Sequence, residues 1–287
     1  MAERVALVAS ERGLRVDPDL PLASAALADA GVGVDLVRWD DGAVDWSAYD
    51  LVVVRSCWDY AWRLEEFLGW AGSVPRLRNP AEVLRWNTDK TYVRELERAG
   101  LPVVPTVWDP AGADDLPEAG EWVVKPSVSA GSRDTARWTT PEEALAHSSS
   151  LTGAGRTAMV QPYLASVDDV GETALLFIGG RLSHAVRKGP LLARGEGVRQ
   201  DRDSRGDLAP TTPTDAQRQL ATAVLDAVPG LVGVTSPPLY ARIDLVEDGA
   251  GRPVVLELEL TEPSLFLPQA PAAAANLVRA VEAELSR

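Results

Sequence analysis

The first hundred residues alternate short apolar runs with segments of helical spacing. Apolar runs typical of strands cover residues 4–10, 32–39 and 49–56. Between the first two runs, apolar positions recur at helical spacing and stop at Gly31, a residue type that often ends helices. Further helical patterns follow at residues 63–71 and 89–99. Strands that alternate with helices predict a small parallel α/β domain, which we place over residues 1–85.

The middle of the chain changes character after Pro102. Strand patterns occur at residues 103–108, 121–126 and 157–161. A Gly/Ser-rich segment, residues 127–134, directly follows the second of them, and a helical pattern begins at Pro141. This combination predicts a compact, lid-like α+β domain over residues 86–160.

The last part of the chain, residues 161–287, predicts a mixed sheet with covering helices. Strand patterns occur at residues 172–178, 181–188, 239–247 and 253–260. The first two form a hairpin that turns at Gly179 and Gly180. Helical patterns occupy residues 215–228 and the Ala-rich end from residue 272. Residues 195–210 are rich in Arg, Asp and Gly and lack periodicity, which predicts a mobile loop.

Composition narrows the choice of partners. The formal charge of −14 disfavours nucleic acids, whose non-specific binding depends on clustered Lys and Arg. The longest apolar runs fall short of the roughly 20 residues that cross a bilayer, and the first residues lack the apolar core of a signal peptide. We therefore expect a cytoplasmic protein that acts on a small molecule, with no membrane or nucleic-acid partner and with homo-oligomerisation left open. Cys57 is the only cysteine, so thiolate metal clusters are excluded.

Lysine is rare in this sequence. Only three of its 28 basic residues are lysines: Lys90, Lys125 and Lys188. Because arginine stands almost everywhere else, each retained lysine suggests a position where a compact ammonium group cannot be replaced by a guanidinium. The alternative for any one of them is an ordinary surface cation.

Four charged residues in the last two predicted strands form the strongest candidate site. Arg242 and Asp244 lie two apart on one strand, and Glu257 and Glu259 lie two apart on the next. Residues i and i+2 share a face of a strand, so one side of the hairpin can present an arginine and three carboxylates. Three carboxylates repel one another unless a cation is present, and Mg²⁺ prefers such oxygen ligands. The alternative is the solvated face of an amphipathic hairpin.

This hairpin resembles that of the ATP-grasp superfamily, whose pattern is R-x-D, then E-x-N, then a loop with small residues or proline. The chain has Arg242-Ile243-Asp244 and Glu257-Leu258-Glu259, followed by Pro263-Ser264. Glu259 replaces the usual asparagine, which adds one negative charge. The resemblance implies an ATP-grasp fold of α/β (α+β) class, with the three domains named above. It also implies that Asp244, Glu257 and Glu259 hold Mg²⁺ on the phosphates of ATP, beside Arg242.

The same resemblance extends to the lysines and to the segment after the second lid strand. It implies that Lys90 and Lys125 contact phosphates of ATP. It implies further that the loop containing Ser129 and Gly131 folds over these phosphates, where small residues let backbone N–H groups approach oxygen atoms closely.

Residues after the third lid strand match the hinge and the acyl site of ATP-grasp proteins. The resemblance implies that Gln161, Pro162 and Leu164 contact adenine through the backbone, and that Glu172 faces the ribose. It also implies a set of cations near the γ-phosphate and the acyl group: Arg187, Lys188 and Arg199. For Glu172 the alternative is a solvated residue at the start of a strand.

One further polar segment follows the third parallel strand, at the sheet end where ligands of α/β proteins collect. Arg55 can bind a carboxylate with two donors and Asp59 can accept an ammonium group, a pair that suits an amino acid. The phrase that includes Tyr60 and Arg63 resembles a branch of ATP-grasp proteins with D-cycloserine-forming ligases. The alternative is a helix start with a surface arginine.

The resemblance to ATP-grasp proteins implies an ATP-dependent carboxylate–amine ligase that forms an acyl phosphate and releases ADP. Within that class we expect ring closure of O-ureido-D-serine to D-cycloserine, with an intermolecular amino-acid or dipeptide ligase as the alternative. A non-catalytic nucleotide-binding regulator on the same fold and an acidic interaction domain are the remaining hypotheses. No P-loop, complete dinucleotide-binding glycine motif or Gly-x-Ser-x-Gly elbow is present, which disfavours other common chemistries.

Overall fold

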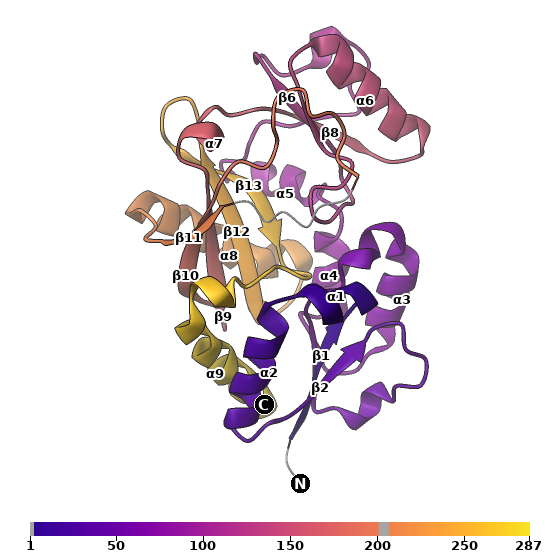
Figure 1. The fold of residues 1–287 in the computed structure, drawn as a ribbon, viewed down its shortest axis with the longest axis vertical. Helices are drawn as coiled ribbons and strands as arrows, with labels where there is room; N and C mark the ends of the chain where they lie inside the picture. The colour runs from indigo at the N-terminus through magenta and orange to yellow at the C-terminus, as the bar shows by residue number, and fades with distance from the viewer. Residues whose placement is uncertain (1–2, 201–206) are drawn as a thin grey trace.

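Three β-sheets and their covering helices make up the part of the chain that the computed structural model describes, residues 3–200 and 207–287. Figure 1 shows the N-terminal sheet in the lower part of the view, the sheet with β6 and β8 at the top, and the largest sheet on the left. The predicted α/β class is confirmed. Among the described residues, no helix is long and apolar enough to span a membrane.

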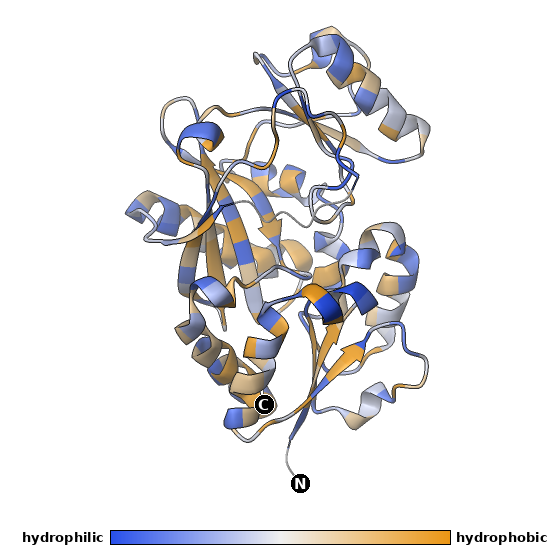
Figure 2. Ribbon diagram, in the orientation of Figure 1, coloured by the Kyte–Doolittle hydropathy of each residue, from blue (hydrophilic) through white to orange (hydrophobic). Residues whose placement is uncertain are grey.

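The first sheet is parallel and has the order β2-β1-β3-β4. Its strands are β1 (Arg4–Ala9), β2 (Gly33–Arg38), β3 (Leu51–Val54) and β4 (Leu77–Arg78). Alternate residues of β1 pack on opposite sides, with Leu7 in a cluster that includes Leu27 of α2 (Asp19–Asp29) and Val8 in a cluster with Phe67 of α3 (Leu64–Ser73). Helices on both faces explain why the central strands β1, after Arg4, and β3 are apolar and buried (Figure 2).

Short elements that the sequence patterns did not reveal lie in the segments between and after the strands of this sheet. They are α1 (Glu11–Val16), η1 (Trp46–Ala48), η2 (Trp58–Trp62) and α4 (Ala81–Asn87). The Ser10 side chain caps α1 by accepting the Gly13 N–H at 3.0 Å. Gly13 lies so close to the end of β3 that a Cβ there would meet the Ser56 carbonyl oxygen at 2.2 Å. Only glycine therefore lets α1 lie against this edge of the sheet.

The second sheet is antiparallel, with the order β5-β8-β6-β7. Its strands are β5 (Val107–Trp108), β6 (Trp122–Pro126), β7 (Ala136–Trp138) and β8 (Ala158–Pro162), with η3 (Ala113–Asp115) in a connection. The predicted helix α6 (Pro141–Gly153) covers one face and is capped by Thr140. The strand expected over residues 103–108 is shorter than predicted because Pro105 cannot donate a ladder hydrogen bond.

The third sheet has the order β11-β10-β9-β12-β13, and its described strands all pair antiparallel, whereas we expected a mixed sheet in this part of the chain. Its strands are β9 (Glu172–Ile178), β10 (Arg181–Lys188), β11 (Leu208–Thr211), β12 (Tyr240–Glu247) and β13 (Pro253–Glu259). Both predicted hairpins, β9–β10 and β12–β13, are confirmed. One face packs on α8 (Asp215–Val232). The other packs on α9 (Ala274–Leu285) and on α2 of the first sheet, as Figure 1 shows.

Other helices complete the description: α5 (Tyr92–Arg98), α7 (Ser166–Asp169), η4 (Leu267–Gln269) and η5 (Pro271–Ala273). The loop predicted over residues 195–210 ends in β11, and residues 201–206 lie outside the described part of the chain. The three-domain division stays a prediction, and its boundaries after residues 85 and 160 fall inside α4 and β8.

Candidate active site

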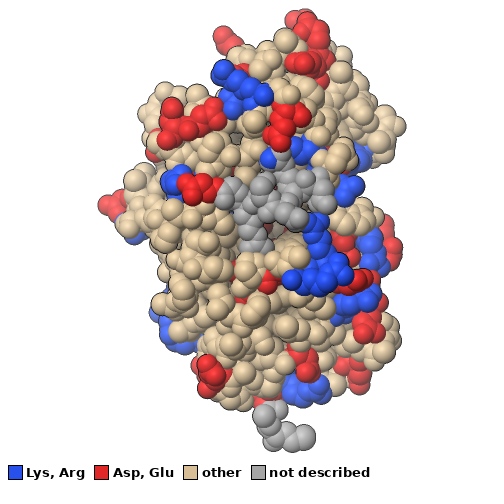
Figure 3. Space-filling view, in the orientation of Figure 1, with Lys and Arg blue, Asp and Glu red and all other residues tan. Residues whose placement is uncertain are grey.

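A cavity of about 750 Å³ is lined by residues of the second and third sheets and of the segments that follow β1 and β3 of the first sheet. One wall consists of β12, β13 and the ends of β9 and β10. A second comes from the start of α5 and from β6, its following loop and β8. The third comes from Ser10 and α1, from η2 and from the loop after β13. Figure 3 shows Lys and Arg side chains gathered at mid-height on one face of the molecule, although its net charge is negative.

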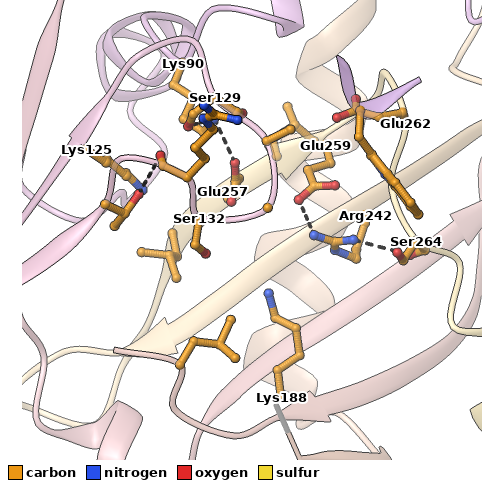
Figure 4. A pocket seen from close by; sticks show the side chains of 18 of the residues that line it. Lys90, Lys125, Ser129, Ser132, Lys188, Arg242, Glu257, Glu259, Glu262 and Ser264 are labelled. Carbon is orange, nitrogen blue, oxygen red and sulfur yellow. Dashed lines mark hydrogen bonds and ion pairs between the residues drawn. The ribbon is translucent and has the colours of Figure 1, made fainter. Parts of the chain in front are cut away.

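The β12–β13 hairpin places the four charged residues of the strongest candidate site directly opposite one another. Its register pairs Arg242 with Glu259 and Asp244 with Glu257. Neighbours at odd positions of β12, such as Ile243, pack towards α8, so Arg242 and Asp244 face the opposite side. The Arg242 guanidinium donates to Asp244 at 3.0 Å and also to Glu259. The four side chains therefore form one charged cluster, of which Arg242, Glu257 and Glu259 line the cavity (Figure 4), whereas Asp244 is fully buried and lies outside the described lining.

The carboxylates of this cluster differ in their electrostatic surroundings. Burial opposes ionisation of Asp244, but Arg242 and Lys188 lower its pKa. Burial likewise opposes ionisation of Glu257, yet Lys90 and Lys125 lower its pKa. Burial raises the pKa of Glu259 to about 7, because the negative charges of Glu257 and Asp244 add to it and Arg242 offsets it only in part. Glu259 is thus the carboxylate of the cluster whose charge the neighbouring cations offset least.

The placement of these three carboxylates fits a divalent cation. Asp244, Glu257 and Glu259 offer carboxylate oxygens that lie within 4.8 Å of one another. Carboxylate oxygens are the ligands that Mg²⁺ prefers, and a cation there would relieve the repulsion that raises the pKa of Glu259. The residues expected from the sequence to hold Mg²⁺ are therefore brought together in a suitable arrangement.

The three lysines of the chain all line the cavity, although they come from distant segments. The Lys90 ammonium donates to the Ser129 carbonyl oxygen at 2.8 Å and lies 3.4 Å from Glu257. Lys188 forms ion pairs with Glu172 at 2.6 Å and with Asp244 at 2.7 Å. Lys125 forms no ion pair with any residue that the structure describes. Burial lowers its pKa, so a bound anion would be needed to stabilise its charge fully.

The lid loop and hinge also contribute to the lining. Of the residues expected to contact ATP there, Ser129, Gly131, Gln161, Pro162 and Glu172 lie on the cavity. The described lining does not include Leu164, which packs in a cluster with residues of β12 and β13. Glu172 is not the solvated strand end of the alternative reading, because its carboxylate pairs with Lys188.

Two of the cations expected near the acyl group lie outside the described lining. Arg187 points to Asp207 and forms an ion pair with it at 2.7 Å. Arg199 donates to the Leu191 carbonyl oxygen and lies 3.4 Å from Glu196. Both side chains are engaged in holding the segment after β10. Arg242 and Lys188 therefore line the cavity, whereas Arg187 and Arg199 lie outside its described lining.

The predicted amino-acid site beyond β3 divides in the same way. Asp59 and Tyr60 line the cavity, whereas Arg55 and Arg63 do not belong to its described lining. Arg63 lies in a network with Asp40, Asp59 and Glu66, and its guanidinium covers the ring of Trp39. Arg55 is fully buried over the ring of Tyr240 and donates to the Pro263 carbonyl oxygen at 2.6 Å. Of the four predicted residues, Asp59 and Tyr60 can therefore contact a ligand in the cavity, whereas Arg55 and Arg63 hold neighbouring parts of the protein in place.

Sequence similarity places the chain in a family. The family model described as the N-terminal domain of D-cycloserine synthetase DcsG matches residues 5–79. The chain is 38% identical to the cycloserine biosynthesis protein DcsG of Streptomyces lavendulae, over 92% of either protein. The chain belongs to the D-cycloserine synthetase family of ATP-grasp ligases. It is therefore an enzyme that uses ATP to form C–N bonds.

Solved structures agree with this assignment. The crystal structure of D-cycloserine synthetase DcsG superposes with a TM-score of 0.90 at 35% identity, covering 98% of this chain and 99% of the other. D-alanyl-alanine synthetase A from Vibrio cholerae gives a TM-score of 0.66 at 14% identity, covering 100% and 99% of the two chains. The second similarity shows that the ATP-grasp fold is shared.

Two segments of this ATP-grasp ligase line the cavity although we had not assigned them to the site. One consists of Ser10 and the following helix α1, which contributes Glu11, Arg12 and Arg15. This segment follows the carboxyl end of a parallel strand, where ligands of α/β proteins collect. The same rule led us to Arg55, and its application to β1 would have predicted this segment as well. The other is the loop after β13, which contributes Glu262, Ser264 and Phe266.

Buried polar contacts from distant residues fix the loop after β13. The Asp19 carboxylate accepts three backbone N–H groups, from Leu265 at 2.6 Å, Phe266 at 3.2 Å and Leu267 at 2.8 Å. These bonds hold Phe266 at a φ of 53°, a left-handed conformation that is costly for a residue with a side chain. Tyr240 donates to the Thr261 carbonyl oxygen at 3.0 Å. The loop is thus held rigidly at the edge of the cavity.

Proposed function

We propose that this enzyme activates the carboxylate of an amino acid as an acyl phosphate and closes a ring on it, taking O-ureido-D-serine to D-cycloserine. The observation that carries the proposal is the three-walled cavity. One wall offers the carboxylates and Arg242, a second offers Lys90 and Lys125, and the third offers polar groups beyond the parallel sheet. The similarity to D-cycloserine synthetase runs through all three walls, because it covers nearly the whole chain.

In the first step, an oxygen of the substrate carboxylate attacks the γ-phosphorus of ATP, and ADP leaves. Lys90 and Lys125 bind the phosphates and Arg242 neutralises charge on the transferred phosphoryl group. Asp244, Glu257 and Glu259 would hold Mg²⁺, which supplies further positive charge at the phosphate oxygens when bound. The protein therefore acts mainly by position and by charge.

In the second step, the nitrogen attached to oxygen in the ureido group attacks the acyl carbon, and inorganic phosphate leaves. The nitrogen loses its proton, and the carbamoyl group must also leave with uptake of water to give D-cycloserine. Because nucleophile and acid belong to one molecule, the cavity needs to orient only one substrate besides ATP. The lid loop with Ser129 and Gly131 lines the cavity and excludes water that would hydrolyse the acyl phosphate.

Product analysis tests the proposal. Purified enzyme, ATP and Mg²⁺ are incubated with O-ureido-D-serine or with a panel of amino acids, and ADP, phosphate and organic products are measured. We expect ADP release that depends on O-ureido-D-serine, together with D-cycloserine identified by mass spectrometry. Dipeptides or amides from two amino acids would instead show intermolecular ligation. ATP binding without turnover of any acid would favour a regulatory nucleotide-binding protein and contradict the proposal.

A further inference from the structure

Among the described residues that line the cavity, one acidic side chain has no partner. Glu262 is 8% exposed and lines the cavity from the loop after β13. Within residues 3–200 and 207–287 its carboxylate forms no hydrogen bond and no ion pair. The other acids of the described lining each pair with a basic residue: Glu11 with Arg15, Asp59 with Arg63, Glu172 with Lys188, Glu257 with Lys90, and Glu259 with Arg242.

A buried carboxylate without a partner is unfavourable, yet the fold holds Glu262 in place. Arg55 and Tyr240 bind the carbonyl groups on either side of it, at Pro263 and Thr261, and Asp19 binds the residues that follow. The loop cannot swing outward to hydrate the carboxylate without breaking these buried bonds. Burial and the charge of Glu259 raise the pKa of Glu262 to about 8. A cation beside it would therefore be strongly favoured.

The position of Glu262 identifies the kind of cation. It does not belong to the three carboxylates whose oxygens lie within 4.8 Å of one another, so it is not part of the candidate metal site. Figure 4 shows Glu262 on the other side of the view from Lys125, with the Glu259 carboxylate between it and Arg242. It therefore lies on the wall formed by the loop after β13, where an acid substrate whose carboxylate is held at Arg242 would extend past Glu259.

We propose that Glu262 accepts the α-ammonium group of the amino acid whose carboxylate is activated beside Arg242, an inference that rests on the proposed function. Asp59, the residue to which the sequence had assigned this group, is already engaged. It accepts the Trp39 indole N–H at 2.9 Å and lies 3.3 Å from the Arg63 guanidinium. Glu262 is the acid of the described lining that still lacks a cation. It is a specificity residue that selects amino acids over acids without an amino group.

The test combines two substrates with matched variants. The substrates are O-ureido-D-serine and its N-acetyl derivative, which lacks the ammonium charge, and ADP release is followed with each. The variants are Glu262→Gln, Glu262→Asp and Asp59→Asn, with Glu65→Gln on the exposed side of α3 as the control. Melting temperature and KM for ATP are recorded for each protein, so that a misfolded variant is recognised.

For the wild type we expect a strong preference for the free amine. Glu262→Gln should raise KM for O-ureido-D-serine by about ten- to hundredfold, the effect of losing one charged hydrogen bond, and leave KM for ATP unchanged. It should not affect the N-acetyl derivative, so the preference collapses. Glu262→Asp should restore part of the preference because the charge returns, and Glu65→Gln should match the wild type. If Glu262→Gln fails to fold, the Glu262→Asp result decides in its place.

Two outcomes overturn the inference alone. One is a wild-type enzyme that uses the amine and its N-acetyl derivative equally well. The other is a preference that Glu262→Gln and Glu262→Asp leave intact while Asp59→Asn abolishes it. If the wild type releases ADP with none of the amino acids of the panel, the proposed function fails and the inference falls with it. The behaviour of the wild type therefore separates the two failures.

Discussion

The wall formed by β12 and β13 and the wall formed by the loop after β13 differ in how their charges are held. On the hairpin, Arg242 pairs with Asp244 and Glu259, and Lys90 and Lys188 pair with Glu257 and Asp244. On the loop, Glu262 has no such partner among the described residues. The charges of the hairpin wall are suited to a metal ion and to phosphates, whereas the carboxylate of the loop wall gains a cationic partner only when a ligand binds.

The largest effect is expected from the hairpin. Glu257→Gln removes a negative charge from the candidate metal site but keeps the size of the side chain, so kcat should fall by about a hundred- to thousandfold. Steady-state ADP release checks this, with Glu247→Gln on the neighbouring strand as a control outside the described lining. Ordinary turnover in Glu257→Gln would show that the hairpin carboxylates are only a polar face.

The hairpin site was predictable because local geometry determines it. Residues two apart share a face of a strand, so the sequence alone indicated that Arg242 and Asp244 lie together and that Glu257 and Glu259 lie together. A tight turn between two strands makes them neighbours. The antiparallel register then brings both pairs face to face without help from distant parts of the chain.

The loop after β13 was not predictable for the opposite reason. Its conformation depends on Asp19, which is far away in the sequence, and on Arg55 beneath it. The partner of Arg55 is equally distant in the sequence and could not be predicted, and for this reason we expected Arg55 in the substrate site. It follows the carboxyl end of β3, as ligand-binding residues often do, but its partner is a carbonyl group more than two hundred residues later.

A second prediction concerns the lysine that has no described ion-pair partner. Lys125→Arg introduces a larger, planar group at a buried position and should raise KM for ATP by about ten- to hundredfold. KM for the acid should change much less, because the loop after β13 is untouched. Nucleotide titrations and the melting temperature without nucleotide check the effect. Wild-type affinity for ATP in this variant would contradict the role of a compact ammonium group.

A smaller effect is expected from the support of the loop wall. Arg55→Lys keeps the charge but loses the planar group that donates to the Pro263 carbonyl oxygen, so the loop loses one buried bond. KM for the acid should rise by about tenfold, with KM for ATP unchanged. Kinetics with each substrate varied in turn separate the two constants. If KM for the acid stays at the wild-type value, the loop does not depend on Arg55.

The smallest effect concerns stability and pH. The pKa of Glu262 is raised to about 8 in the folded protein, so the folded protein binds this proton more tightly than the unfolded chain does. The stability gained in this way is fully present below the ordinary glutamate pKa and is lost as the pH rises through about 8. Glu262→Gln cannot lose this proton. Without Mg²⁺ and nucleotide, the melting temperature of the variant relative to wild type should therefore rise by a few degrees between pH 5 and pH 9. A difference that stays constant or falls would mean that Glu262 is not held in an unfavourable ionised state.

The central claim is that the substrate carboxylate attacks ATP, and an oxygen label tests it most directly. O-ureido-D-serine labelled with ¹⁸O in its carboxylate is converted by the enzyme, and the inorganic phosphate is analysed by mass spectrometry. An acyl phosphate that is opened by the ring nitrogen transfers one carboxylate oxygen to phosphate. We therefore predict one ¹⁸O in each phosphate formed. Phosphate without the label, released in step with product, would contradict activation of the carboxylate.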